Sequence, residues 1–310
     1  MTAVLSLRGL GKDYGTRTAV RAIDLDVERG ECLGLLGPNG AGKTTTISMA
    51  CGVLTPTRGT ALIGGVDLRK EPNVAKRKLG LVPQDLAVYE ELTAKQNLQY
   101  FGALYGLRDE ARIAWALGVV GLAERAGDLV KTYSGGMKRR LNIAAGIIHK
   151  PELLILDEPT VGVDPQSRNH IFETVKQLRG EGMTVVYTSH YMEEVELLCD
   201  RVAIVDHGEV VALGSIQELV AAHAGKGIEL ELVGTPEVVE AAVAAATAHG
   251  AVVREDARKE LLRIVPTAGL GPVLAAIEGT GAAVARIESR QANLETAFLA
   301  LTGRGLRDAA

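Results

Sequence analysis

The sequence Gly37-Pro38-Asn39-Gly40-Ala41-Gly42-Lys43-Thr44 has the form G-x-x-x-x-G-K-[ST]. It follows an apolar run at 32–36 and precedes a run of helical character at 45–50. A strand, a tight loop and a helix in this order form a cradle for phosphate groups. We expect positive φ angles at Gly37, Gly40 and Gly42, because such angles bring backbone N–H groups close to an anion. The loop therefore predicts a phosphate-binding site at the end of a strand.

Two side chains of this loop are suited to a nucleoside triphosphate. Lys43 can reach the β- and γ-phosphates, and the hydroxyl of Thr44 can bind Mg²⁺. The N-terminus of the following helix adds partial positive charge. A chance glycine-rich turn is the alternative reading, since 36 of the 310 residues are glycine. The strand and helix that flank the loop favour the phosphate site.

The composition limits the class of protein. A chain of 310 residues can hold one large domain or two ordinary ones, and 47% hydrophobic residues suffice for a buried core. The net charge of −4 gives no basic field for nucleic acid. The three cysteines lack metal-ligand spacing, and we expect buried, reduced thiols. Neither a signal peptide nor a run of eighteen apolar residues is evident, so a membrane role requires a partner.

The pattern along the first two thirds of the chain predicts an α/β cassette. Short strands fill residues 1–30, and a helical subdomain is expected at about 85–150. Strand-type runs then return, separated by helical segments at 165–178 and 191–198: they lie at 153–156, 184–187, 202–205 and 210–213. Alternating strands and helices favour a largely parallel sheet, and we assign this cassette to residues 1–222.

A second, smaller domain is predicted after a linker of small residues at 223–227. Its pattern is β-α-β-β-α-β followed by a helix, with a tail at 305–310. The strands are expected at 228–233, 251–254, 261–265 and 282–287, and the helices at 236–248, 268–278 and 292–302. This order suggests an α+β domain of the split βαβ, ferredoxin-like type over residues 228–304.

Two further motifs lie at the ends of predicted elements. The apolar strand 153–156 leads into Asp157 and Glu158, where Asp157 can hold Mg²⁺ through water and Glu158 can act as general base. A buried strand ending in a solvated acidic turn is the alternative. Ser134-Gly135-Gly136 precedes an amphipathic helix and can form a second anion site. A plain helix N-cap would need the serine but not the two glycines.

These motifs, in this order and spacing, resemble the nucleotide-binding subunit of ATP-binding cassette (ABC) transporters over roughly residues 4–220. Residues 37–44 match its Walker A loop, 153–158 its Walker B strand with the catalytic glutamate, and 134–136 its signature. The resemblance implies a P-loop NTPase fold of the ABC ATPase type, binding ATP and Mg²⁺. The signature departs from the common LSGGQ form, since Tyr133 replaces Leu and Met137 replaces Gln. This puts in doubt any contact made by a Gln side chain.

The resemblance also assigns roles residue by residue. Gln84 corresponds to the Q-loop glutamine, Asp164 to the D-loop and His190 to the switch histidine, while Tyr14 corresponds to the aromatic residue that stacks on adenine. The implied catalytic residues are Lys43, Gln84, Glu158 and His190. The implied metal ligands are Thr44, Gln84 and Asp157. The implied nucleotide contacts are Tyr14, Gly37, Pro38, Asn39, Gly40, Ala41, Gly42, Lys43, Thr44, Thr45, Ser134, Gly135, Gly136 and Asp164.

The resemblance further implies partners and a location. ATP is expected between two subunits packed head to tail, in a homodimer or a dimer with a paralogous ATPase. The helical subdomain is expected to receive a separate membrane permease, which would hold the chain at the cytoplasmic, inner face of the cell membrane. The ending at 292–304 is similar to that of type-2 exporter subunits, including daunorubicin-type drug-resistance pumps. It favours export of a substrate over import.

Three other classes of protein fit parts of the pattern. A soluble ABC ATPase of DNA repair or translation typically has long coiled coils or tandem cassettes, and this sequence shows neither. A P-loop kinase needs no Ser-Gly-Gly element or switch histidine. A module that binds ATP without hydrolysis would not need Lys43, Asp157, Glu158 and His190 together. The sequence therefore favours the ATPase subunit of an exporter.

Overall fold

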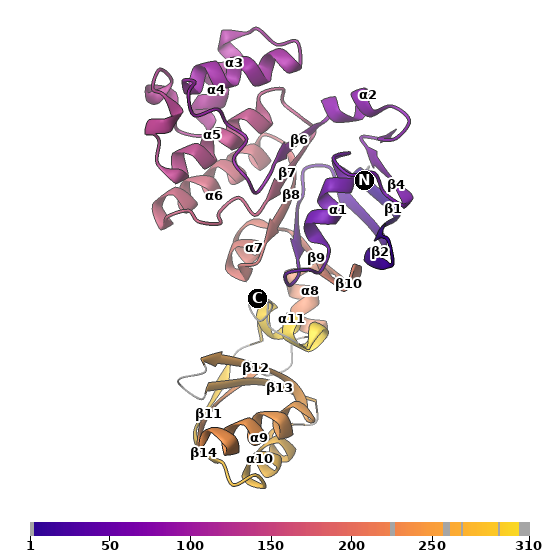
Figure 1. The fold of residues 1–310 in the computed structure, drawn as a ribbon, viewed down its shortest axis with the longest axis vertical. Helices are drawn as coiled ribbons and strands as arrows, with labels where there is room; N and C mark the ends of the chain where they lie inside the picture. The colour runs from indigo at the N-terminus through magenta and orange to yellow at the C-terminus, as the bar shows by residue number, and fades with distance from the viewer. Residues whose placement is uncertain (1–2, 224–226, 257–260, 268, 291, 304–310) are drawn as a thin grey trace. The chain divides into compact units, whose positions relative to one another are not determined.

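The computed structural model describes residues 3–223, 227–256, 261–267, 269–290 and 292–303. The chain divides into two units, one formed by Met1–Leu36 with Gly40–Val210 and the other by Gly37–Asn39 with Val211–Ala310. Figure 1 labels their helices and strands.

The central element is a six-stranded sheet of order β10-β9-β3-β8-β7-β6, which belongs to the first unit except for the residues of β10 after Val210. Strands β9, β3, β8, β7 and β6 run parallel to one another. Both β3 and β7 are buried along their whole length, because helices cover both faces of the sheet, and this explains their unbroken apolar sequence. The bounds are β3 Cys32–Leu36, β6 Leu79–Val82, β7 Leu153–Asp157, β8 Thr184–Ser189, β9 Arg201–Asp206 and β10 Glu209–Ser215.

The parallel arrangement brings four loops to one edge of this sheet. Leu36 lies opposite Ser189, Asp157 opposite Thr188, and Val82 opposite Leu156. These residues lie at or next to the carboxyl ends of β3, β7, β8 and β6. In open parallel sheets ligands bind at this edge. The segments that start at residues 37, 158, 190 and 83 are therefore neighbours although the sequence separates them widely.

A second, antiparallel sheet of order β2-β1-β4-β5 completes the core of this unit. Its strands are β1 Ala3–Tyr14, β2 Arg17–Glu28, β4 Arg58–Ile63 and β5 Val66–Asp67. Helix α1 (Lys43–Ala50) contacts β1, β2 and β7, and one continuous apolar core includes side chains of all four elements. The short strand β5 and the helix α2 (Pro72–Arg77) were not predicted from the sequence. All three cysteines are buried and free.

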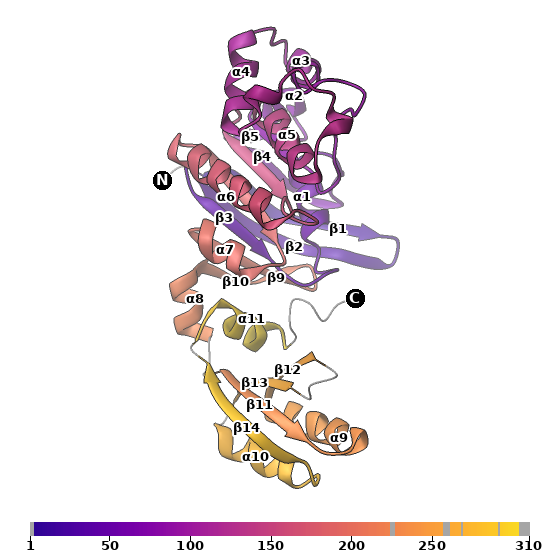
Figure 2. The same cartoon turned by 90° about the vertical axis from the view of Figure 1, so that its left-hand side faces the viewer.

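The predicted helical subdomain contains three helices that pack on one another, α3 (Ala94–Leu104), α4 (Glu110–Val119) and α5 (Gly135–Ile147). Figure 2 shows them gathered at one end of the unit. Each begins at a residue whose side chain accepts a backbone hydrogen bond, namely Thr93, Asp109 and Ser134. Two 3₁₀ turns, Ala123–Arg125 and Val130–Thr132, connect α4 to α5. Helices α6 (Pro165–Gly180) and α7 (Met192–Leu198) precede β8 and β9, respectively.

The second unit has a sheet of order β12-β13-β11-β14 in which all pairs are antiparallel. This is the strand order of a split βαβ domain. The helices α9 and α10 pack against it, and α11 contacts α8, β12 and β13. The elements are α8 Ile216–His223, β11 Gly227–Val233, α9 Pro236–Thr247, β12 Gly250–Asp256, β13 Leu261–Pro266, α10 Leu270–Glu278, β14 Ala283–Arg290 and α11 Leu294–Thr302.

The division between the units falls between Val210 and Val211, before the boundary that composition predicts at residue 222. The difference arises because α8 packs on α11 and so belongs with the second unit. Of the predicted linker at 223–227, His223 ends α8 and Gly227 begins β11, and residues 224–226 lie outside the described residues. The predicted tail at 305–310 also lies outside them.

Candidate nucleotide-binding site

The glycine-rich loop joins β3 to α1 at the carboxyl edge of the central sheet. Gly40 and Gly42 have φ of 79° and 103°, which only glycine adopts easily. A side chain at Gly42 would also meet the carbonyl oxygen of Ala19 at 2.9 Å. The predicted positive φ at Gly37 is wrong, because this residue continues directly from the last residue of β3 and is not left-handed. The loop turns at the second and third glycines instead.

Lys43 is the first residue of α1, and its side chain is 6% exposed. Burial lowers the pKa of the Lys43 ammonium group, and the charges of Glu158 and Asp157 oppose this change. The Lys43 ammonium group therefore interacts electrostatically with both carboxylates. Thr44 is exposed and Thr45 is half-buried, at the start of α1 beside the loop. Pro38 and Ala41 are buried, whereas Asn39 is exposed.

Asp157 and Glu158 are held by a single hydroxyl group, that of Thr188. The Thr188 hydroxyl donates to Asp157 Oδ1 at 2.7 Å and accepts from the Glu158 backbone N–H at 2.8 Å. Burial and the charge of Glu158 raise the pKa of Asp157, and the Thr188 hydrogen bond opposes them. Glu158 has a φ of 46°, an unfavourable conformation for a residue with a side chain. The hydrogen bond to its N–H helps to hold this conformation.

We predict that Thr188→Val lowers ATP turnover about ten-fold and the free energy of unfolding by about 1–3 kcal/mol, because two buried hydrogen bonds are lost. Thr188→Ser keeps the hydroxyl and is the matched control, for which we expect turnover near that of the unaltered chain. Steady-state phosphate release and denaturant unfolding measure both quantities. Equal turnover of the Val and Ser variants would show that the hydroxyl has no part in the site.

His190 follows β8 and lies against Glu158. Its Nδ1 is 3.3 Å from Glu158 Oε2. The imidazole ring also packs on the Tyr191 ring, with 4.2 Å between centroids, and the Arg168 guanidinium lies 5.2 Å from the Tyr191 centroid. These contacts give His190 a defined direction. The predicted base and the predicted switch residue are thus neighbours in space.

Gln84 is exposed, two residues after β6, at the same edge of the sheet. Its loop is fixed to α5 at two points. The carbonyl oxygen of Pro83 accepts from Arg139 Nη1 at 3.0 Å, and the backbone N–H of Ala87 donates to Asn142 Oδ1 at 3.2 Å. The structure therefore links the loop that carries Gln84 to the helix that begins after Ser134.

Ser134 is the N-cap of α5, and its hydroxyl accepts from the Met137 N–H at 3.2 Å. Ser134 and Gly135 are exposed. Gly136 is buried against Ser167, with no room for a side chain. The described hydrogen bonds of Ser134 stay within its own helix N-terminus. Plain capping is therefore present, but it leaves the Gly135 face open.

Asp164 is the N-cap of α6 and accepts from the Ser167 N–H at 2.9 Å. This hydrogen bond lowers the pKa of the Asp164 carboxyl. Tyr14, at the end of β1, is 51% exposed, and Lys12 Nζ lies 5.3 Å from its ring centroid. An exposed ring of this kind can stack on a planar base. Tyr133, which departs from the common signature, is buried and donates to the Arg125 carbonyl oxygen at 2.7 Å.

Several residues of this site were not found from the sequence. They are polar side chains that are themselves buried: Thr188, Arg139, Asn142 and Glu194. Their one sequence signal is a polar residue within an otherwise buried strand or helix, since buried polar groups normally have hydrogen-bond partners.

The chain is similar to known proteins over nearly its whole length. The model of the family described as ABC transporter matches residues 20–161. The linearmycin resistance ATP-binding protein LnrL of Bacillus subtilis is 47% identical over 314 residues, an alignment covering 98% of this chain and 100% of that protein. The chain belongs to the ABC transporter family. In the described residues, no helix is long and apolar enough to cross a bilayer.

Other relatives agree with this assignment. Nod factor export ATP-binding protein I of Cupriavidus metallidurans is 39% identical, covering 99% of this chain and 100% of that protein. Daunorubicin/doxorubicin resistance ATP-binding protein DrrA of Streptomyces peucetius is also 39% identical, covering 99% and 94%. A solved ATP binding subunit of an ABC transporter is 30% identical with a TM-score of 0.65, covering 71% of this chain and 92% of that one.

These comparisons confirm the predicted family and the P-loop ATPase fold. The chain is an ATPase and the ATP-binding subunit of an ABC exporter. The prediction of an exporter subunit is therefore confirmed, and the alternative in DNA repair or translation is not supported.

Proposed function

We propose that two copies of this chain, or one copy and a paralogue, enclose ATP head to tail. In each site the Lys43 loop of one subunit binds the triphosphate, and Ser134–Gly136 of the other covers it. The observation that supports this most strongly is the exposure of Gly135 at a helix N-terminus whose described hydrogen bonds are all local. Such an end offers free N–H groups to an anion brought by a partner.

The proposed reaction transfers the γ-phosphoryl group to water. Glu158 accepts a proton from the water while the water oxygen forms a bond to the γ-phosphorus. The bond from that phosphorus to the oxygen that bridges it to ADP breaks. His190 contacts the γ-phosphate and is oriented by Glu158 and Tyr191. Tyr14 stacks on adenine. Lys43 balances the charge that spreads over the phosphate oxygens.

Thr44, Gln84 and Asp157 fit Mg²⁺, since all three offer oxygen atoms at one edge of the sheet. When bound, Mg²⁺ supplies neutralisation of the phosphate charge. The fit rests on the Asp157 carboxylate, of which the described hydrogen bonds use only Oδ1.

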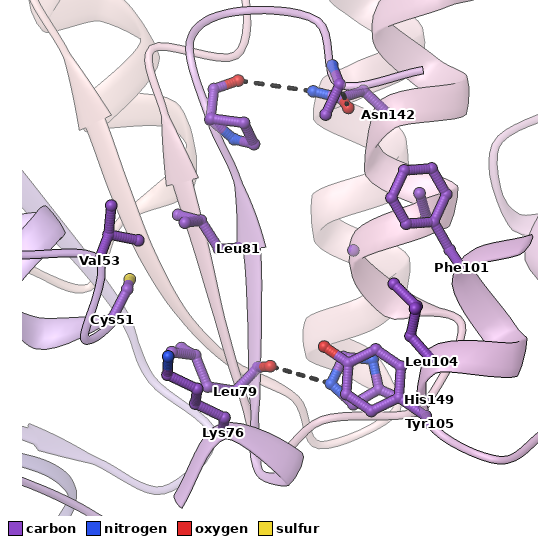
Figure 3. A pocket seen from close by; sticks show the side chains of 14 residues that line it. Cys51, Val53, Lys76, Leu79, Leu81, Phe101, Leu104, Tyr105, Asn142 and His149 are labelled. Carbon is purple, nitrogen blue, oxygen red and sulfur yellow. Dashed lines mark hydrogen bonds between the residues drawn. The ribbon is translucent and has the colours of Figure 1, made fainter. Parts of the chain in front are cut away.

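We further propose that the permease binds a groove beside the Gln84 loop. The groove has a volume of about 310 Å³ and is mainly apolar. One wall comes from the sheet region, with Cys51, Val53 and Leu81, and the other from the helical subdomain, with Phe101 and Leu104 (Figure 3). An inserted helix would therefore contact both parts of the unit and respond to their relative position.

Two stacked aromatic rings also line the groove and favour an apolar occupant. The rings of His149 and Tyr105 stack at 3.8 Å between centroids, and His149 Nε2 lies 2.9 Å from the Leu79 carbonyl oxygen (Figure 3). Burial lowers the pKa of His149, which favours its neutral form. Pro83 and Asn142 line the same groove, so its occupant lies beside the contacts that hold the Gln84 loop.

Replacing Leu104 with Glu tests this docking site. Leu104 is 66% exposed, and we expect the charge to reduce co-sedimentation of the full chain with permease-containing membranes about ten-fold, while basal ATPase activity is unchanged. Leu197 is 51% exposed and lies outside the groove, so Leu197→Glu is the matched control. Equal losses for both variants, or no loss for either, would contradict the proposed site.

The proposed location is the cytoplasmic face of the cell membrane, where the permease holds the chain. The relatives are named for resistance to linearmycin and to daunorubicin or doxorubicin, and for Nod factor export. Their full-length similarity supports the outward transport of an organic molecule of this general kind. The permease, rather than this chain, would contact the cargo.

A further inference from the structure

A buried carboxylate, Glu194, lies behind the proposed catalytic residues. It is 2% exposed and belongs to the first turn of α7. Three hydroxyl groups donate to it: Thr160 at 2.8 Å, Tyr187 at 2.9 Å and Ser189 at 2.8 Å. Arg168 Nε lies 3.7 Å from its Oε1. Because an ionised carboxylate is costly to bury, this set of donors is a built feature rather than an accident of packing.

The donors come from the segments that carry the site. Thr160 is two residues after Glu158, in the loop that follows β7. Ser189 directly precedes His190, and its oxygen also accepts from the Tyr191 N–H at 2.9 Å. Arg168 is in the first turn of α6, which Asp164 caps. One carboxylate thus contacts the loop after β7, the last residue of β8 and the first turn of α6.

Tyr187 differs from the other donors. It lies inside β8, where the ladders to β3 and β7 fix its backbone. Its hydroxyl therefore helps to satisfy Glu194 but is not needed to place a loop. By contrast, Thr160 lies beyond the end of β7. Ser189 is the last residue of β8, where the ladder to β7 has already ended and the segment with His190 begins.

We propose that Glu194 is a positioning residue for ATP hydrolysis. It holds the loop of Glu158 and the loop of His190 in one relative arrangement, so that Glu158 Oε2 and His190 Nδ1 remain 3.3 Å apart. This inference rests on the proposed roles of Glu158 and His190. Misplacing such groups lowers the rate of the chemical step without weakening the binding of the triphosphate elsewhere.

The experiment compares three variants, each of which removes one of the hydroxyl groups that donate to Glu194. We expect Thr160→Val and Ser189→Ala to lower kcat about ten-fold, with KM for MgATP changed by less than about two-fold. Tyr187→Phe removes an equivalent hydrogen bond and is the matched control, for which we expect kcat within about two-fold of the unaltered chain. Thr160→Ser, which keeps the hydroxyl, should restore kcat. Glu194→Gln should lower kcat at least as much as whichever of Thr160→Val and Ser189→Ala lowers it more.

Thermal unfolding of the three variants separates position from stability. Similar decreases in Tm with unequal kcat support the proposal. A loss of kcat in Tyr187→Phe equal to that in Ser189→Ala would overturn it. A higher KM with unchanged kcat in Thr160→Val and Ser189→Ala would also overturn it. Glu158→Gln is assayed alongside. Undiminished turnover by that variant would overturn the proposed function itself, whereas its inactivity together with full activity of Thr160→Val and Ser189→Ala would overturn only the role of Glu194.

Discussion

Glu158→Gln is expected to reduce ATP turnover by at least about 10²-fold and to leave a stable ATP-bound dimer, because the amide cannot accept the proton of the attacking water. Gln has almost the same size as Glu, so the packing against His190 is kept. The amide also removes a negative charge near the γ-phosphate, which favours bound ATP over released products. Hydrolysis should therefore fail after binding.

Two measurements test this result. Phosphate release gives the turnover number, and size-exclusion chromatography with and without MgATP gives the oligomeric state. Glu193→Gln is the matched control, since Glu193 is exposed on α7 and lies outside the proposed site. We expect the control to turn over normally and to show only a transient dimer. A Glu158→Gln chain that hydrolyses ATP at the normal rate, or stays monomeric with ATP, would contradict the proposed mechanism.

The main features of the fold could be predicted because strands that are buried on both faces have an easily recognised sequence pattern. Strands β3 and β7 are covered on both faces and read as unbroken apolar runs. The strand β5 has two half-buried residues and carries no such pattern. The boundary of the second unit depends on the packing of α8 on α11, far apart in sequence. Composition at the linker cannot report such a contact.

The residues of the proposed site also form two groups, those selected from the sequence and those recognised only in the structure. Lys43, Asp157, Glu158 and Ser134 stand at the ends of predicted elements, so spacing alone was enough to select them. Thr188 and Glu194 act through partners on other elements. The contact of Thr188 with Asp157 exists because the register of β7 and β8 pairs these two residues. Register between strands is set by the assembled sheet, and local sequence does not contain it.

The second large effect is expected at Lys43. Lys43→Met keeps the apolar stem but removes a positive charge that acts on both Asp157 and Glu158. We expect ATP turnover to fall at least about 10²-fold, because the lysine cation that contacts the β- and γ-phosphates is lost. Lys176→Ala, at an exposed lysine of α6, is the control and should be fully active. Normal turnover by Lys43→Met would exclude the loop as the triphosphate site.

A mixing experiment extends this prediction to the composite site. A Cβ at Gly135 meets no atom within 4 Å, so Gly135→Asp should fold, and an acidic residue also suits a helix N-terminus. Between subunits it would repel the phosphate and inactivate both sites of its own homodimer. A heterodimer of Lys43→Met and Gly135→Asp chains keeps one intact site, with Lys43 from one chain and Gly135 from the other. With free exchange of subunits, the mixture should recover about a quarter of normal turnover. If each chain held a complete site, mixing would restore nothing, because every chain carries a defect.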